Sequence, residues 1–373
     1  MATRTYLDHA ASSPVVPEAA AAMRELLGVP GNPSSLHAAG RAARRVLEDA
    51  RESLAADLGA HPSEVVFTSG GTEADNLAVL GVQVADRPQI AVSAVEHPAV
   101  AAVRDRHTDV VVLPVDAGGH LDLAASALLV GPQTALVSVM WVNNETGAVQ
   151  PVAEVVDLAH RAGVLAHSDA VQAFGHLAVD FAASGLDLLS TSAHKLGGPV
   201  GIGALLVRRG TRLAPVGFGG GQEARLRSGT APVALAAGFA AASRVAAGRR
   251  VAEATRLAAL RDRLVAGALA TVPRTRSNTV EPCGPAIVNL TFAGVRADDV
   301  LLLLDAAGFD ASTGSACTAG VHQPSEVLLA MGRSLDDASA SLRFSFGPPT
   351  TTEQVDALLA VLPGIVERAR AAA

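Results

Sequence analysis

The sequence predicts an α/β protein with a mainly parallel sheet, covered by helices on both faces and followed by a smaller α/β domain. Short apolar, β-branched runs alternate along the chain with Ala- and Leu-rich stretches of helical periodicity, an order typical of parallel sheets. The chain has 373 residues, of which 49% are hydrophobic and 17% are charged. It is therefore long and apolar enough to fold around a sizeable core.

Seven runs are expected to form strands of the large sheet or their ends, because each is short, apolar and bounded by turn residues. They lie at 64–69, 89–95, 110–116, 134–140, 164–170, 186–195 and 202–208. Helical patterns between them cover 72–80, 98–105 and 153–162. After the Gly-rich segment 217–230 the pattern changes to a long helix over about 232–270, followed by apolar runs at 286–294 and 341–347. This change marks the start of the smaller domain.

Composition excludes several classes of function. The net charge is −7, from 29 Lys and Arg against 36 Asp and Glu, and no long basic run suggests a nucleic-acid partner. We expect no membrane span and no export signal, because no apolar stretch has the required length and flanks. The two cysteines, Cys283 and Cys317, form neither a disulfide framework nor a metal-ligand pattern, so we expect a reducing, cytoplasmic setting and no metal.

Functional groups of open α/β sheets gather where strands end, and the first candidate lies at 68–76. The sequence TSGGTEADN places Gly70 and Gly71 between a strand and a helix that begins near Thr72. Close backbone approach and free N–H groups at a helix start favour a phosphate. A purely structural Gly-Gly turn before a capped helix is the alternative.

Three further strand ends carry ionisable side chains. Asp169, with Gln172, follows one run, and its carboxylate either binds a cationic heterocycle or caps a helix. Lys195 follows His194 at a strand end rich in small residues and glycine, where partial burial would lower its pKa and favour Schiff-base chemistry over a solvated charge. His97 suits acid–base work or ring stacking, although a single histidine is often structural.

Together these groups predict a pyridoxal 5′-phosphate (PLP) site. A phosphate-binding turn, an aspartate for the pyridine nitrogen, a lysine for the aldehyde and a flat ring are the components that this cofactor requires. Their joint occurrence is a stronger signal than any one of them.

Longer motifs give a family resemblance over nearly the whole chain. They include GNPSSLH, FTSGGTEADNLA, VEHPAV, VNNETGAVQPV, HSDAVQAFG, SAHKLGGPVGIGAL, GGGQEARLRSGT and STGSACTAG. On these motifs the sequence resembles the cysteine desulfurases of the class V aminotransferase family. The resemblance implies fold type I of the PLP enzymes, a homodimer, a large domain over 15–255, and a small domain made of 1–14 with 256–373.

The resemblance also implies roles for the residues that match the family motifs. Lys195 would bind the cofactor covalently, Asp169 would contact the pyridine nitrogen, His97 would stack on the ring and Gln172 would lie by its phenolic oxygen. The residues expected to hold the phosphate are Gly71, Thr72, Ser192 and His194, with Thr230 reaching the phosphate of the neighbouring subunit. Asn144 and Arg343 would contact the substrate amino acid, the latter through its carboxylate.

Cys317 resembles the sulfur-accepting nucleophile of these enzymes, set in a loop of small residues. The resemblance implies that it attacks the sulfur of L-cysteine, releasing L-alanine and leaving a persulfide for an acceptor protein, either an iron–sulfur scaffold or a thiolation enzyme. His97 is a candidate proton carrier in this reaction, and Cys283, which precedes a strand, is interpreted as structural. The alternatives are a selenocysteine lyase, a class V aminotransferase or epimerase, and a non-catalytic PLP-binding protein.

Overall fold

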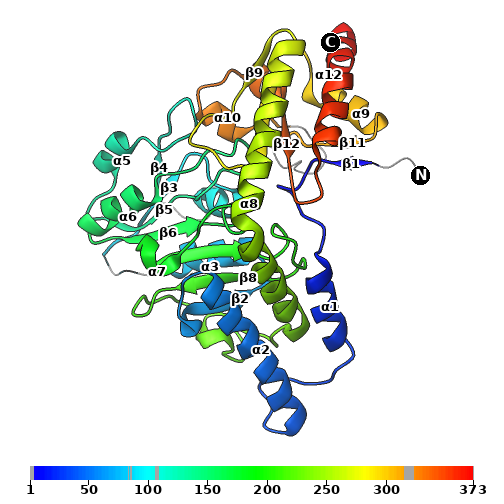
Figure 1. The fold of residues 1–373 in the computed structure, drawn as a ribbon. Coiled ribbons are helices and arrows are strands. Elements are labelled where there is room, and N and C mark those ends of the chain that lie inside the picture. The colour runs from blue at the N-terminus through cyan, green and yellow to red at the C-terminus, as the bar shows by residue number, and fades with distance from the viewer. Residues whose placement is uncertain (1–3, 83, 85, 106–108, 315–322, 373) are drawn as a thin grey trace.

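The computed structural model describes residues 4–82, 84, 86–105, 109–314 and 323–372. A seven-stranded sheet with the order β2-β8-β7-β6-β5-β3-β4 forms its centre (Figure 1). The strands are β2 (Val65–Thr68), β3 (Gln89–Ser93), β4 (Val110–Leu113), β5 (Thr134–Ser138), β6 (Leu165–Asp169), β7 (Leu188–Ser192) and β8 (Gly203–Val207). β8 runs antiparallel to β2 and β7, and the other pairs are parallel. The mainly parallel sheet is confirmed.

Burial explains why these strands consist mainly of apolar and small polar side chains. Every residue of β2, β5 and β7 is buried, so the side chains on both faces of the sheet meet packed helices. The antiparallel β8 is a detail that the apolar runs did not predict. β7 and β8 are joined by a turn with no crossover helix, and such a short connection brings the chain back in the opposite direction.

Helices pack around this sheet. They are α1 (Pro17–Leu26), α2 (Ala38–Asp57), α3 (Gly71–Gly81), α4 (Pro98–Ala101), α5 (Leu123–Leu129), α6 (Val152–Arg161) and α7 (Phe181–Ser184). The helical pattern at 98–105 is divided between α4 and the 3₁₀ turn η2 (Ala102–Asp105). Among the described residues, no helix is both long and apolar enough to cross a membrane.

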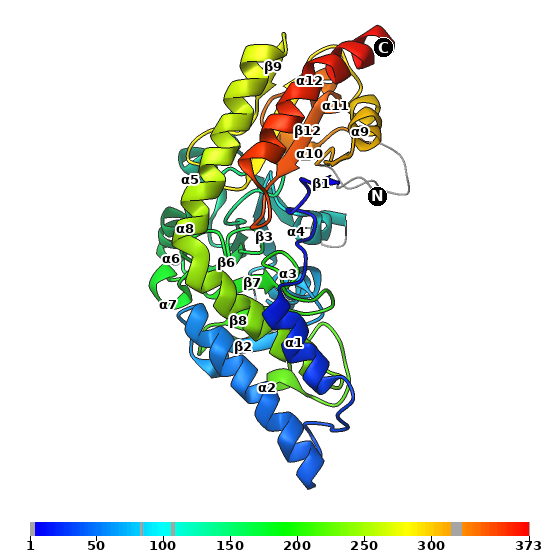
Figure 2. The ribbon, with the colours of Figure 1, turned by 45° about the vertical axis from the view of Figure 1, so that its right-hand side comes forward.

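A second hydrophobic cluster lies at the C-terminal end of the molecule. Its three-stranded antiparallel sheet consists of β9 (Thr275–Ser277), β10 (Ile287–Phe292) and β12 (Ser341–Ser345). The helices α9 (Ala297–Ala306) and α12 (Thr352–Ala372) contribute to this cluster. The short helices α10 (Glu326–Ala330) and α11 (Leu335–Ser339) pack in a separate small cluster that includes Val95. β1 (Thr5–Tyr6) pairs in parallel with β11 (Phe309–Asp310), so the start of the chain joins this part before descending to α1 (Figure 2).

The 39-residue helix α8 (Val233–Thr271) runs along both parts of the molecule (Figure 1). Its residues from Ala236 to Ala246 belong to the core around the large sheet, and those from Leu257 to Ala268 belong to the second cluster. The expected domain boundary at 255 lies inside this helix and stays a prediction.

Candidate active site

A cavity of about 200 Å³ collects most of the residues singled out at the strand ends. The predicted residues that line it are Gly71, Thr72, His97, Asn144, Asp169, Gln172, Ser192, His194 and Lys195. They lie 124 positions apart in the sequence at most, and each follows a strand or begins a helix of the large sheet. The structure thus brings them together where the parallel strands end.

The turn expected to bind phosphate is the start of α3, just after β2. Gly71 is needed there, because a Cβ atom at this position would come within 2.9 Å of Val171 Cγ2. The turn is also anchored at its edge, where Glu73 accepts a hydrogen bond from the Ser69 N–H at 2.5 Å and pairs with Arg227 at 3.1 Å. The N-terminus of an 11-residue helix thus faces the cavity and favours an anionic ligand.

Asp169 is the last residue of β6 and is 4% exposed. Its Oδ1 accepts a hydrogen bond from the Val171 N–H at 2.8 Å, so the carboxylate caps a turn and also lines the cavity. Burial raises the pKa of Asp169, while the His97 ring, the Val171 N–H and the Lys195 ammonium oppose that rise. A buried carboxylate with these neighbours is suited to a cationic ring nitrogen.

Lys195 stands just beyond β7, in a turn that Gly197 permits with a φ of +91°. Its Nζ donates hydrogen bonds to the carbonyl oxygens of Ala10 and, at 3.1 Å, Ala11. Burial, together with the positive charge of Arg343, lowers the pKa of Lys195 to about 8. A lysine with this pKa can lose its proton near neutral pH and act as a nucleophile or base.

Two histidines of the cavity are held neutral. His97 Nδ1 accepts a hydrogen bond from the Ala99 N–H at 3.1 Å at the start of α4, so the neutral ring carries its proton on Nε2. Burial, with the nearby lysine, lowers the pKa of His97, although Asp169 opposes the change. Burial and the Lys195 charge lower the pKa of His194 to about 4.

Arg343 lies outside this cavity but close to it. It belongs to β12, is 5% exposed, and donates from Nη1 to the Asn144 carbonyl at 2.9 Å and from Nη2 to Asp8 Oδ1 at 2.7 Å. Its Nε is buried and has no hydrogen-bond partner among the residues that the structure describes. The guanidinium is therefore fixed beside Asn144, with one edge already occupied by Asp8.

Two other predicted residues have different outcomes. Thr230 is exposed on its own chain and does not line the cavity. Cys317 lies outside the described residues, which stop at Gly314 and resume at Gln323. Gly314 has a φ of +84°, and a Cβ there would lie 3.3 Å from the Oε2 atom of Glu145.

Sequence reasoning missed three residues that line the cavity, namely Asp75, Met140 and Val171. Asp75 had a detectable signal, because it lies one helical turn after Gly71 and therefore on the same face of α3. Met140 and Val171 are neutral side chains at strand ends and carry no chemical signal of their own.

Cys283 has the surroundings of an unreactive thiol. Its Sγ accepts a hydrogen bond from Arg261 Nη1 at 2.7 Å. Burial raises the pKa of Cys283 to about 12, against the opposing charge of Arg261. A thiol that is protonated at neutral pH is a poor nucleophile, which agrees with a structural role.

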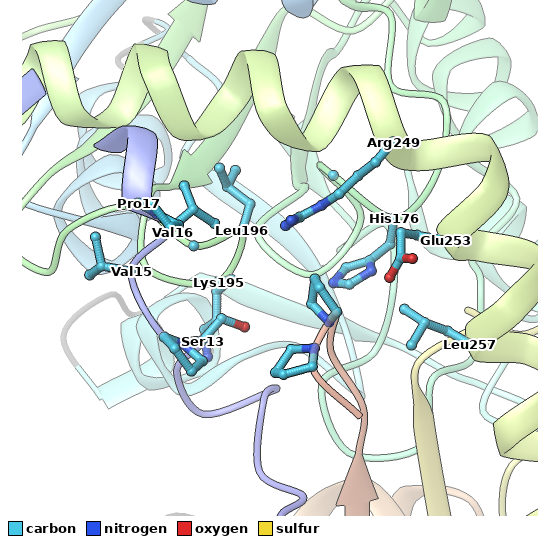
Figure 3. A pocket seen from close by; sticks show the side chains of 15 residues that line it. Ser13, Val15, Val16, Pro17, His176, Lys195, Leu196, Arg249, Glu253 and Leu257 are labelled. Atoms are coloured by element: carbon cyan, nitrogen blue, oxygen red, sulfur yellow. The ribbon is translucent and has the colours of Figure 1, made fainter. Parts of the chain in front are cut away.

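A larger cavity of about 360 Å³ also has Lys195 in its wall (Figure 3). It is lined mainly by the segment 13–17, by Leu196 and by side chains of α8, among them Arg249 and Glu253. The only predicted site residue that it shares with the smaller cavity is Lys195. The smaller cavity, where the aspartate, the histidines and the α3 N-terminus converge, is therefore the candidate active site.

The chain is similar to known proteins over nearly its whole length. The model of the family described as "Aminotransferase class-V" matches residues 5–358. The chain belongs to the aminotransferase class-V family. Among its relatives, the "IscS-like cysteine desulfurase" of Mycobacterium tuberculosis is 48% identical over 99% of this chain and 98% of its own. "Cysteine desulfurase NifS" of Azotobacter vinelandii is 41% identical over 98% of this chain and 93% of its own.

Solved structures of class-V relatives have the same fold. A "NifS-like protein" superposes with a TM-score of 0.92 at 32% identity, covering 98% of this chain and 100% of its own. The NifS-like protein from Rickettsia africae superposes with a TM-score of 0.90 at 29% identity, covering 98% and 99%. These similarities confirm the resemblance to class V cysteine desulfurases and the fold predicted from the motifs.

Proposed function

We propose that the chain is a PLP-dependent cysteine desulfurase that converts L-cysteine into L-alanine and passes the sulfur to an acceptor protein. The observation that carries this proposal is the convergence of Lys195, Asp169, His97 and the α3 N-terminus on one cavity. The relatives named cysteine desulfurase, at 38–48% identity over nearly the whole chain, favour this activity over the other class V reactions.

The residues of the cavity fit PLP in charge and in chemistry. The α3 N-terminus with Gly71, Thr72, Ser192 and His194 would hold the phosphate, and Asp169 would pair with the pyridine nitrogen. Lys195, with its pKa near 8, would bind the aldehyde. When bound, PLP withdraws electrons from the Cα atom of an attached amino acid. The neutral His97 ring would stack on the cofactor, and Gln172 would lie by its phenolic oxygen.

Lys195 and His97 would move the protons of the reaction. The free Nζ of Lys195 would take the Cα proton of the substrate, for which a pKa near 8 is well matched. The Nε2–H of His97 is the proton that this ring can donate, because its Nδ1 is bound to the Ala99 N–H. The ring is thus suited to protonating the alanine product before release.

Sulfur transfer would use the Cys317 thiolate. The thiolate would attack the substrate sulfur, so that an S–S bond forms and the substrate C–S bond breaks. This step leaves a persulfide on Cys317, and the electron pair of the C–S bond stays with the carbon fragment. Arg343 and Asn144 would hold the substrate carboxylate, with Asp8 yielding Nη2 to it. The acceptor would be a protein of iron–sulfur cluster assembly or of thiolation.

We further propose that the active unit is a homodimer. Thr230 is exposed and away from the cavity of its own chain, which leaves it available to the phosphate of a neighbouring subunit. Phe218, in the same segment, and Leu36 are each 89% exposed, and a neighbouring subunit that covered them would bury this apolar surface.

The test is to measure alanine and sulfide released from L-cysteine in the presence of PLP and dithiothreitol. The wild type should release both in equal amounts, whereas Cys317→Ala and Lys195→Ala should release neither. Cys283→Ala is the matched control, because it removes the other thiol and should keep the activity. Full activity in Cys317→Ala, or PLP binding without cysteine turnover in the wild type, would assign the chain to another class V reaction or to a non-catalytic role.

A further inference from the structure

Asp75 is a buried acid beside the candidate active site, and the proposed reaction makes no use of it. It is 1% exposed, it lines the cavity, and its Oδ1 is buried with no hydrogen-bond partner in the described part of the chain. One side-chain atom of Asp75, one of His97 and one of Asp169 all lie within 4.8 Å of one another. Two carboxyl groups thus share a site from which water is largely excluded.

No positive charge neutralises Asp75 within the described part of the chain. The ion-pair candidate there is His167, whose Nε2 lies 3.7 Å from Asp75 Oδ1. That ring is completely buried between the hydroxyl groups of Ser138, 2.8 Å from Nδ1, and Ser190, 2.9 Å from Nε2. Burial lowers the pKa of His167 to about 3, so the ring is neutral and brings no charge.

Asp169 is better placed to be the ionised member of the pair. It accepts the Val171 N–H and lies near Lys195 and His97. Asp75 has instead the Ser190 hydroxyl group, the neutral His167 ring and a further buried acid, Glu96, around it, and burial raises the pKa of Glu96 to about 8. Burial and the Asp169 charge raise the pKa of Asp75 well above its usual range. Two carboxylates facing each other cannot form a hydrogen bond, but a single proton on one of them supplies it.

We infer that Asp75 is a positioning residue, which keeps its proton and donates a hydrogen bond to Asp169, holding that carboxylate ionised and aimed at the ring nitrogen of PLP. This inference rests on the proposed use of Asp169 in cofactor binding. A hydrogen bond to the charged form of Asp169 favours that form, so Asp75 helps Asp169 to stay negative in a buried site.

Two substitutions of similar size test whether Asp75 acts as a hydrogen-bond donor or as a negative charge. Asp75→Asn keeps a neutral hydrogen-bond donor, and Asp75→Leu removes it. The readouts are the PLP dissociation constant and the acid-side midpoint of the pH titration of the absorbance of the bound cofactor. For Asp75→Asn we expect both to stay near the wild-type values. For Asp75→Leu we expect the midpoint to move to higher pH and PLP affinity to fall about tenfold or more, as for a lost hydrogen bond to a charged group.

An ionised Asp75 would give the opposite sign. Removing a negative charge beside Asp169 would favour ionised Asp169, so both variants would lower the midpoint, and that result would overturn the inference. Unchanged behaviour of Asp75→Leu would also overturn it. If Asp75→Leu fails to fold, as thermal unfolding would show, the Asp75→Asn midpoint decides alone. Neither readout needs cysteine turnover, so failure of the desulfurase assignment is seen separately, in the alanine assay.

Discussion

Gly71 offers a direct test of how tightly the cofactor site is packed. In Gly71→Ala the new Cβ would lie 2.9 Å from Val171 Cγ2, closer than carbon atoms in contact normally approach. Val171 cannot move freely, because its side chain is β-branched and its N–H holds Asp169 at 2.8 Å. We therefore expect the clash to displace the aspartate turn.

The magnitude follows from the cost of overpacking a close-packed site, about 1–3 kcal/mol. Replacing glycine by alanine inside a helix stabilises the helix by less than about 1 kcal/mol, and this gain affects the stability of the fold more than the affinity for PLP. PLP binding should therefore weaken by about 5-fold to 150-fold. The assay is equilibrium PLP binding followed by absorbance, with thermal unfolding measured on the same samples.

A double variant tests the cause. Gly71→Ala with Val171→Ala removes the methyl groups that the new Cβ would meet, since the only other atom within 4 Å is Ser192 Cβ at 3.7 Å. Most of the lost affinity should return, after allowance for the effect of Val171→Ala alone. If the double variant binds PLP as weakly as Gly71→Ala does, the clash is not the cause and the reasoning fails.

Three other outcomes are expected. Arg51→Met should lower the free energy of unfolding in urea by about 3–5 kcal/mol, because it leaves the Glu223 carboxylate buried without the 2.8 Å ion pair. Arg44→Met, at an exposed position, is the control and should have little effect. Equal losses in the two variants would contradict this. Ser325→Ala should lower the free energy of unfolding by about 1–2 kcal/mol in the same assay, because Ser325 caps α10 and donates a hydrogen bond to buried Glu145. Ser334→Ala removes an exposed helix cap and should lower it by less. In protein stripped of cofactor, the free energy of unfolding of the wild type relative to that of Lys195→Met should rise between about pH 8 and pH 10. The reason is that Lys195, with its lowered pKa, loses its proton at a lower pH in the folded state than in the unfolded state. A difference that stays constant across this range would refute the lowered pKa.

The strands and the charged residues at their ends were predictable because they follow from local patterns, whereas the remaining site residues came from the family motifs. Buried strands leave apolar runs such as 134–140, and parallel strands bring their ends to one edge, so the meeting of Lys195 and Asp169 could be expected from the order of the runs alone. The direction of β8 was not predictable from its apolar residues, because strand direction is set by the connection and not by hydrophobicity.

Polar side chains on helices were harder to assign. Asp75 has the helical spacing from Gly71 as its one signal in the sequence, and its 1% exposure and its distance from Asp169 are known from the structure alone. The ion pair of Arg343 with Asp8 joins residues 335 positions apart, and no local sequence pattern predicts such a contact. The same limit applies to the Lys195 contacts with Ala10 and Ala11, which depend on how the N-terminal segment passes the cavity.

The continuity of α8 has a consequence for how the molecule unfolds. One uninterrupted helix supplies buried side chains to both hydrophobic clusters, so melting either cluster removes packing partners from the same hydrogen-bonded segment. The two parts should therefore lose structure together, in a single calorimetric transition. Arg250→Pro, between the two buried stretches of α8, would interrupt its backbone hydrogen bonds, and heating should then resolve two separate transitions.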